Sequence, residues 1–416
     1  MIETDIAVIG AGPAGLMASI YAAHKSAKAV IIDTNTTPGL KLLRTGGGRC
    51  NITHSLPINE FIKVYGDSSK FLRFALHDFG PDKTIEFFEK NALKIQTDEH
   101  GFCYPYTNRA SDVKRVLTDI AESFKVKFQM ASKIEHIERE KRLFILQAPK
   151  EVILAKAVII ATGGMSWPQT GSNGDGYKFA KTLGHTIVNP KPALVPLKTA
   201  DTWMHKLTGV AIDRVAIRAE FEDKKFTTVG PMIFTDNGIG GPAVLDFSRY
   251  ITDYLAAGKP AMIKLDLIPD RTLDQIDNNL TDLCRMHPKK EIPGILSEFM
   301  PRKLALSICE NFDYLKATLS GQLNKQNRRK LAGMLKGLEV KVIAPRSMNE
   351  ATITRGGVST AEIDDKTMQS KICPGLFFAG EVIDVDGPCG GFNLQICWST
   401  GVLAGTNAQK YTTALK

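Results

Sequence analysis

The chain has 416 residues, of which 43% are hydrophobic and 23% charged, a balance typical of a globular protein large enough for at least two packed domains. The formal net charge is +9, but lysine and arginine are spread along the chain. We interpret the densest basic stretch, 325–336, as a solvated helix face and do not expect a nucleic-acid partner. No apolar run approaches the roughly 20 residues of a membrane-spanning helix, so we expect no membrane span.

The cysteines and the first residues predict a cytoplasmic location. The seven cysteines show neither a CxxC pair nor the regular spacing of a disulfide framework. Glu3 and Asp5 precede the first apolar stretch, which does not suit a secretory signal. We make no prediction of the oligomeric state.

A strand, a glycine turn, a helix and a second strand open the chain. Residues 5–9 and 29–32 are apolar and β-prone, and the helix between them is expected to run from Ala14 to Lys25. The turn reads GxGxxG, in which the first glycine allows a tight turn, the second admits a pyrophosphate, and the third lets helix and strand pack closely. At the end of the second strand, the Asp33 carboxylate can accept hydrogen bonds from both ribose hydroxyls. We therefore assign to a dinucleotide site Gly10, Gly12, Pro13, Ala14, Gly15 and Asp33.

The string TGGGRCN at 45–51 is the second candidate segment. Its three successive glycines expose backbone donors, and Arg49 adds a fixed cation with a fork of donors. It lacks the Lys-Ser/Thr ending of a P-loop, so we expect it to wrap the cofactor. Cys50 is either a redox partner or a packed structural thiol, and the absence of a nearby second cysteine favours the latter. The cofactor residues assigned here are Lys41, Thr45, Gly46, Gly47, Arg49, Cys50 and Asn51.

Helices and then short strands are expected between 58 and 161. Residues 58–91 show helical apolar spacing, and we expect five aromatic residues in the core, namely Phe71, Phe74, Phe79, Phe87 and Phe88. Short strands are expected at 126–128, 133–137, 143–148 and 152–154, followed by a buried strand at 157–161 that returns to the nucleotide-binding sheet. We assign Ile134, Ala161, Thr162 and Gly163 to the cofactor site. The loop 171–180, with Asp175 between glycines, either lines the substrate side of the cofactor or caps a helix.

An inserted domain is expected after three prolines at 190, 192 and 196. Strands are expected at 210–220, 225–234 and 261–267, several helices within 273–337, and a returning strand at 340–344. The predicted parts are a first cofactor-binding part at 1–195, a β-rich insert at 196–268, a helical subdomain at 269–337, a return strand at 338–345, and a second cofactor-binding part at 346–416.

Two later segments favour FAD over NAD. AVIIATGG at 157–164 and GLFFAGEVID at 375–384 are typical of strands that end beside the flavin half of the cofactor, where Glu381 would bind ribityl or ribose oxygens. In GPCGGFNLQ at 387–395, glycines precede a helix whose partial positive end would face the pyrimidine edge of the flavin and stabilise the anionic reduced ring. We assign to this part of the site Gly380, Glu381, Gly391, Phe392, Asn393 and Leu394.

Several other kinds of chemistry lack their motifs. The eight histidines show no metal-ligand spacing, there is no GxSxG string, and no second GxGxxG follows a strand and precedes an acid. We therefore predict no metal site, no serine triad and no dedicated NAD(P)H domain. No catalytic acid or base is assigned.

The strings TGGGRCN, SWPQTGSNGDGY, FTDNGIGGPA, RGGVSTAEI and GEVIDVDGPCGGFNLQ resemble the BaiN-like family of bacterial NAD(P)/FAD-dependent oxidoreductases, which includes aminoacetone oxidases. The resemblance covers nearly the whole chain. It implies an α/β protein with a Rossmann-like, two-dinucleotide-binding FAD domain, interrupted by an inserted β-barrel-like and helical domain that closes over the isoalloxazine ring. The chain departs from the family pattern, in segments expected to face substrate, at His54, Trp167, Asp236, Gly240 and Ile396. Substrate identity is therefore not carried over, and a role for a histidine at 236 is excluded.

The leading hypothesis is an FAD-dependent oxidoreductase that transfers hydride between flavin N5 and a small organic substrate, with NAD(P)H as a candidate transient electron donor. Oxidation of a small amine and reduction of an activated double bond both remain open. Two other classes are considered. One is a tRNA-modifying flavoprotein, which the basic charge balance allows, and the other is a redox sensor that holds FAD without turnover.

Overall fold

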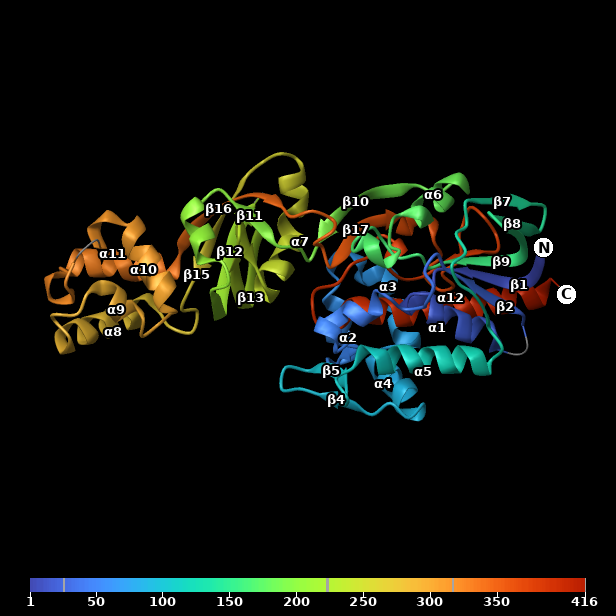
Figure 1. Ribbon diagram of the computed structural model, residues 1–416, viewed down its shortest axis with the longest axis horizontal. Helices are drawn as coiled ribbons and strands as arrows, with labels where there is room; N and C mark the ends of the chain where they lie inside the picture. The colour runs from blue at the N-terminus through green and yellow to red at the C-terminus, as the bar shows by residue number, and fades with distance from the viewer. Residues whose placement is uncertain (25–26, 222–223, 316–317, 416) are drawn as a thin grey trace. The chain divides into compact units, whose positions relative to one another are not determined.

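The computed structural model describes residues 1–24, 27–221, 224–315 and 318–415, which form two compact units (Figure 1). The first unit combines Met1–Lys191 with Thr352–Lys416, and the second is the continuous segment Pro192–Ala351. Lys25, expected at the end of the first helix, and residues 316–317 of the expected helical region lie outside the described residues. The finer division of the insert at 268/269 and 337/338 stays a prediction.

A seven-stranded sheet in the described part of the chain organises the first unit. Strand β1 (Ile2–Ile9) lies between β2 (Ala29–Ile32) and β9 (Glu151–Ile160), and both neighbours run parallel to it. Further strands pair with this centre: β6 (Lys127–Gln129) with β2, β18 (Leu376–Phe378) with β9, β8 (Leu143–Ala148) with β9, and β7 (His136–Glu140) with β8. Because β2, β1, β9 and β18 are parallel, their carboxyl ends meet at one edge of the sheet, where dinucleotides bind in folds of this kind.

Three strand predictions were wrong in their bounds. The strands expected at 152–154 and 157–161 form the single strand β9, in which Lys156 continues the strand and forms an ion pair of 2.7 Å with Asp5. The first half of β9 pairs with β8, and most of its length pairs with β1. The same strand therefore belongs both to an antiparallel hairpin and to the parallel part of the sheet. The strand expected at 133–137 begins only at His136.

Two long-range partners, α1 (Pro13–Ala22) and α12 (Phe392–Ala414), pack directly against each other. Their backbones come so close that a Cβ added at Gly405 would lie 2.3 Å from the Ala18 carbonyl oxygen, and one at Gly401 would lie 2.7 Å from that of Ala14. The last segment of the chain therefore covers the helix that follows the first strand, as Figure 1 shows in red and blue.

The remaining helices of the first unit lie around this centre. They are α2 (Ile58–Lys63), α3 (Ser69–Asp78), α4 (Pro81–Lys90), α5 (Ala110–Ser123) and α6 (Asp175–Thr182). Two small sheets complete the unit: β3 (Thr53–His54), β5 (Phe102–Pro105) and β4 (Ile95–Thr97) form one, and β10 (Ile187–Ala193) and β17 (Ile353–Val358) form the other.

One of the five aromatic residues expected in the core is not there. Phe79 and Phe88 are buried, and Phe71 and Phe87 pack against the core, but 42% of Phe74 is exposed. On α3 the buried positions are Leu72, Ala75 and Leu76, so Phe74 falls on the opposite side of the helix. The helical spacing was correct, and the assignment of this one ring to the apolar face was wrong.

The second unit is built on a closed six-stranded antiparallel barrel in the described residues, which confirms the barrel-like insert. Its strands, in barrel order, are β11 (Leu197–Thr199), β14 (Gly238–Gly240), β13 (Lys224–Thr235), β12 (Ala211–Phe221), β15 (Ala261–Asp266) and β16 (Leu338–Pro345). The helix α7 (Pro242–Ala256) packs on β13. The first and last strands of the insert, β11 and β16, pair directly and close the barrel.

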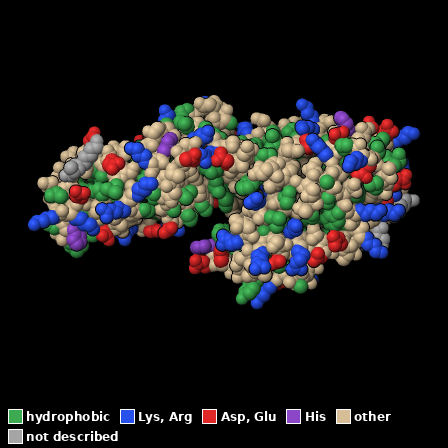
Figure 2. All heavy atoms as spheres, viewed as in Figure 1, with side chains coloured by type: hydrophobic (Ala, Val, Ile, Leu, Met, Phe, Trp, Pro, Cys, Tyr) green, Lys and Arg blue, Asp and Glu red, His purple; other side chains and the backbone are tan. Residues whose placement is uncertain are grey.

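Among the described residues, four further α-helices follow the barrel strand β15: α8 (Leu273–Met286), α9 (Ile292–Leu296), α10 (Arg302–Asn311) and α11 (Lys325–Lys336). A buried ion pair links them to the barrel, because Asp266 at the end of β15 lies 2.7 Å from Lys336 of α11. On the face shown in Figure 2, basic and acidic side chains of this unit are interspersed, as expected of a solvated surface.

The α1–α12 contact generates a stability prediction. Gly405→Ala should lower the free energy of unfolding by about 1–3 kcal/mol, because the new methyl group collides with backbone that cannot rotate away. The matched control is Lys410→Ala on the exposed side of the same helix, expected to change stability by less than about 0.5 kcal/mol. Equal effects of the two substitutions in guanidinium unfolding would contradict the close-packing argument.

Candidate functional site

The turn between β1 and α1 is shaped by backbone contacts that only glycine permits. A Cβ at Gly10 would lie 2.4 Å from the Ala161 carbonyl oxygen, and one at Gly15 would lie 1.8 Å from that of Gly10. A Cβ at Gly12 would meet no heavy atom within 4 Å, so protein packing does not explain this glycine. The open side of Gly12 leaves room for a ligand at the start of α1, where the first amide groups of a helix can bind phosphate.

Asp33 follows β2 and lies beside this turn. One carboxylate oxygen accepts a 2.6 Å hydrogen bond from the Ala11 amide, and the other accepts two bonds of 2.8 Å from the amide and side chain of Asn35. These bonds orient the carboxylate and leave a further acceptor position on the oxygen that accepts from Ala11, because the other oxygen already accepts two bonds. The free position suits a predicted bond from a ribose hydroxyl.

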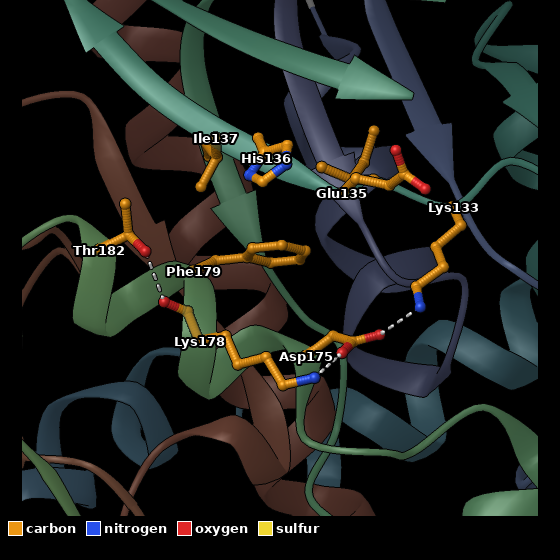
Figure 3. Close-up of a pocket in the computed structure, with 9 residues that line it drawn as sticks. Lys133, Glu135, His136, Ile137, Asp175, Lys178, Phe179 and Thr182 are labelled. Carbon is orange, nitrogen blue, oxygen red and sulfur yellow. Dashed lines mark hydrogen bonds and ion pairs between the residues drawn. The ribbon is translucent and has the colours of Figure 1, made fainter. Parts of the chain in front are cut away.

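A pocket of about 370 Å³ lies between β7 and α6 in the same unit (Figure 3). Ile134 lines it, and the adjoining loop contacts the end of β2, since the Ser132 amide donates to the Asp33 carbonyl oxygen at 2.9 Å. Asp175 lies in the pocket between the ammonium groups of Lys178, at 2.8 Å, and Lys133, at 3.9 Å. Burial opposes ionisation of Asp175, but hydrogen bonds from Lys178 and Asn173 overcome it and hold the pKa of this carboxyl below its usual value. Asp175 is also the first residue of α6, so it lines a pocket and begins a helix at once.

The glycine loop at 45–51 has an unusual backbone. Gly46, Gly47 and Gly48 all have positive φ angles, and so does Cys50, at 62°. The loop is closed by its own hydrogen bonds, from the Cys50 amide to the Thr45 carbonyl oxygen and from the Thr45 hydroxyl to that of Leu42. Clustered left-handed residues are common at ligand-binding turns, because they direct successive amide groups to one side.

Cys50 is fully buried, and burial raises the pKa of its thiol to about 12. This supports the structural interpretation of Cys50 over the redox one. The seven cysteines form no disulfide within the described ranges.

A network around Glu381 joins four segments that are far apart in the sequence. Lys41, just before the glycine loop, lies 2.6 Å from one carboxylate oxygen of Glu381. The other oxygen accepts hydrogen bonds from the Ser166 hydroxyl at 3.0 Å and from the Thr354 amide at 2.8 Å. Lys41 also donates to Ser166 at 2.7 Å. The carboxylate is thereby fixed beside Gly163, whose added Cβ would lie 4.0 Å from it.

The start of α12 is held against the same region. A Cβ at Gly391 would lie 2.7 Å from backbone atoms of Thr53, two residues after the glycine loop. The Asn393 side chain bonds back to Gly387 and so shapes the loop before the helix. The Phe392 ring packs on Phe61 and His54, which leaves its backbone rather than its ring for a cofactor.

The structure thus brings most predicted site residues into one unit, at or near the carboxyl ends of the parallel strands. The turn after β1, Asp33, the segment after β9, the Lys41–Glu381 pair and the start of α12 are connected by the contacts above. Gly380 joins them directly, because its added Cβ would lie 2.6 Å from that of Ala14. Cys50 and Leu394 point into the core, and Ile134 lies apart in the pocket of Figure 3. That these residues bind FAD stays a prediction, which the open space at Gly12 and the phosphate-binding helix start support.

Sequence reasoning missed three polar residues of this region, namely Ser166, Thr354 and Tyr177. Ser166, in the irregular stretch after β9, and Thr354, near the start of β17, hold Glu381. Each is an ordinary hydroxyl residue that no spacing signal marks. The Tyr177 hydroxyl is buried and has no hydrogen-bond partner among the described residues. Burial, and then the charges of Glu381 and Asp384, raise the pKa of Tyr177. The position of Tyr177 after GDG was the available signal.

One of the positions that depart from the family pattern does not face an open site. Ile396 is 2% exposed, within α12, and so packs in the core rather than toward a substrate. Asp236 lies in the second unit, where it pairs with Arg346 at 2.5 Å.

The Lys41–Glu381 pair generates a prediction. Lys41→Met should lower the free energy of unfolding by about 1–3 kcal/mol and weaken FAD binding, because Glu381 then keeps only neutral donors. Adding Glu381→Gln should restore most of the stability. The control, Lys178→Met, removes a far more exposed pair of similar length and should cost less than about 1 kcal/mol. A loss in Lys178→Met as large as in Lys41→Met would refute the special role of the partly buried pair.

The thiols generate another prediction. With pKa values of about 12, Cys50 and Cys397 should resist iodoacetamide at pH 8, where only about one thiol in ten thousand is ionised. When the protein is unfolded before iodoacetamide is added, peptide mass spectrometry should show that both residues are labelled. Rapid labelling of Cys50 in the native protein would instead favour a redox role.

Comparisons with known proteins match the whole chain. The family model described as "HI0933-like protein Rossmann domain" matches residues 4–407. A 3-dehydro-bile acid delta(4,6)-reductase from Clostridium scindens is 32% identical over 97% of this chain and 98% of its own. A ribosomal RNA dihydrouridine synthase from Escherichia coli is 29% identical over 96% of both chains.

Two solved structures share the fold. An open-conformation flavocytochrome c3 fumarate reductase aligns with a TM-score of 0.53 at 17% identity, over 99% of this chain and 79% of that one. A 3-ketosteroid delta1-dehydrogenase from Sterolibacterium denitrificans aligns with a TM-score of 0.53 at 10% identity, over 99% and 100%. Both confirm the Rossmann-like fold with its insert.

Two other features are absent from the described residues. No helix there has the length and apolar character needed to cross a membrane. No group of three or more histidine, cysteine or acidic side chains in those ranges is arranged to hold a metal ion. The full-length family match and the 32% identical relative settle the classification: the chain belongs to the HI0933-like, or BaiN-like, family of FAD-dependent Rossmann-domain proteins.

Proposed function

We propose that this FAD-dependent oxidoreductase reduces a carbon–carbon double bond conjugated to a carbonyl group, with NAD(P)H as the electron donor. The observation that carries the proposal is the full-length similarity to two relatives named for reactions of this kind. By its name, a delta(4,6)-reductase of 3-dehydro bile acids saturates double bonds that are conjugated to a 3-oxo group. By its name, a dihydrouridine synthase saturates the uracil double bond that is conjugated to a carbonyl group. Each double bond that is saturated gains a hydride and a proton.

The geometry supports a cofactor that lies along the carboxyl edge of the sheet. When bound, FAD supplies the hydride-carrying ring. The open side of Gly12 and the start of α1 would accept the pyrophosphate, and Asp33 the adenosine ribose. Glu381, held by Lys41, Ser166 and Thr354, would bind ribityl oxygens.

The start of α12 supports reduction at the same place. The helix is 23 residues long, and Gly391 at its N-cap has a φ of 89°. Unpaired amide groups at such a start carry a partial positive charge, which stabilises negative charge on a reduced ring. Close packing of Gly391 on Thr53 keeps this end of the helix beside the glycine loop.

Amine oxidation, as in aminoacetone oxidases, is the alternative reaction for a small molecule. Both relatives described above are named for reductive reactions, which favours the reductase. The substrate can be a small conjugated ketone or a base in RNA. We therefore replace the expectation of no nucleic-acid partner by a second candidate function. This candidate is uridine reduction in ribosomal RNA, which the E. coli relative favours because it matches through the insert as well as the cofactor unit.

One experiment tests the reaction class. The purified protein should be yellow, and NADH or NADPH added without oxygen should bleach the flavin band. A 3-oxo-Δ4,6 steroid or uridine-containing ribosomal RNA should then restore the colour, and mass spectrometry should show two hydrogens added to the substrate. Bleaching by a small amine, with hydrogen peroxide formed in air, would show an oxidase instead. Protein that cannot take up FAD would refute the proposal entirely.

The two substrate classes can be distinguished by how strongly binding or turnover depends on salt concentration. RNA binding should weaken steeply between about 50 and 200 mM salt, since each phosphate contact releases counterions. Turnover of a steroid should change little over that range. Absence of RNA retention at low salt would remove the RNA candidate and leave the small-molecule reductase.

A further inference from the structure

The β5 strand places an aromatic ring over the glycine loop. Tyr104 pairs with Gln96 of β4, and its ring faces Arg49, whose guanidinium carbon lies 4.9 Å from the ring centroid. A Cβ added at Gly46 would lie 3.7 Å from the Tyr104 ring, so the ring covers the start of the loop as well as its arginine. Neither the glycine spacing nor the resemblance singles out Tyr104.

Arg49 is held at two points and keeps the end of its side chain available. Its Nε donates to the Gly46 carbonyl oxygen at 3.3 Å, and its guanidinium group lies over the Tyr104 ring. Its two terminal nitrogens form no hydrogen bond or ion pair with any residue in the described ranges. Burial raises the pKa of Tyr104, and the Arg49 cation counteracts this rise, so the two groups interact electrostatically as well as sterically.

An exposed arginine on a ring is often a surface contact that contributes little to stability. Here the arginine belongs to a loop with four left-handed residues, and it is fixed with its donors free. A guanidinium whose rotamer is already chosen loses less entropy when it binds an oxygen acceptor. The pair therefore has the features of a preorganised acceptor-binding point rather than of a stability element.

We propose that Tyr104 is a positioning residue that holds Arg49 so that its terminal N–H groups bind an oxygen of the flavin cofactor. This inference rests on the proposed function in that it takes FAD to bind beside the glycine loop. It adds a residue on a separate hairpin to the cofactor site. Tyr104 acts through its ring face, so its hydroxyl group is dispensable.

The test compares two substitutions at Tyr104 by the dissociation constant of FAD and the midpoint potential of the bound flavin. Tyr104→Leu should weaken FAD binding about three- to thirtyfold, the range expected of a cation–π contact. If the contact favours the reduced ring, a tenfold loss of affinity for reduced FAD relative to oxidised FAD lowers the midpoint potential by about 30 mV. Tyr104→Phe should stay within about twofold of the wild type, because the ring face is kept.

Two further variants distinguish a positioning role of Tyr104 from a general disturbance of the fold. Tyr106→Leu removes a similar contact, between Lys94 and the Tyr106 ring at 4.9 Å, just beyond β5, and should leave both quantities unchanged. In an Arg49→Leu background, Tyr104→Leu should add less than about twofold, because the ring acts only through the arginine.

The inference fails if Tyr104→Leu matches the wild type in both quantities, or if Tyr104→Phe is as impaired as Tyr104→Leu. It also fails if only the substrate KM changes, since the arginine would then serve the substrate and not the flavin. A wild-type protein that binds FAD but reduces no double bond would refute the proposed reaction, while the FAD affinities would still decide the role of Tyr104.

Discussion

The first unit depends on how closely separate pieces of backbone approach one another at the end of β1. Gly10 touches the backbone after β9, Gly15 touches Gly10, and Gly401 and Gly405 bring α12 onto α1. Any side chain at these points would push the elements apart by more than a packed core tolerates. Because α1 is held this tightly, Gly380 reaches Ala14, and Glu381 comes to lie among residues from three other segments. The position of the polar network is thus a consequence of backbone packing.

That network combines charge with incomplete burial. The side chains of Lys41 and Glu381 are 21% and 16% exposed, so neither is fully removed from water, and the pair is further satisfied by Ser166 and the Thr354 amide. A carboxylate held in this way keeps its orientation without a large desolvation penalty. It can therefore present a fixed acceptor to hydroxyl groups of a ligand, which a freely rotating surface glutamate would do less well.

The sequence was most informative where a residue type has a single physical reason to be present. The glycines of the first turn, the acid after β2 and the glycine loop predicted the Rossmann-like fold and most of the candidate site. It was least informative for residues whose role depends on a distant partner. Ser166 and Thr354 become significant only because the chain returns after the insert, and Tyr104 only because β5 folds over the loop. Phe74 shows the same limit in the core, since helical spacing alone did not decide which side of α3 is buried.

The two units differ in the order in which their parts leave the ribosome. The second unit is one continuous segment, and its barrel closes when β16 pairs with β11, so all of its strands exist once residue 345 has been made. The first unit still lacks β18 and α12 at that moment, although β9 and α1 need them as neighbours. Nascent chains fold domain by domain as they emerge. The barrel can therefore fold during synthesis, whereas the nucleotide-binding sheet must wait, with one side of β9 and of α1 uncovered, until the final helix is released.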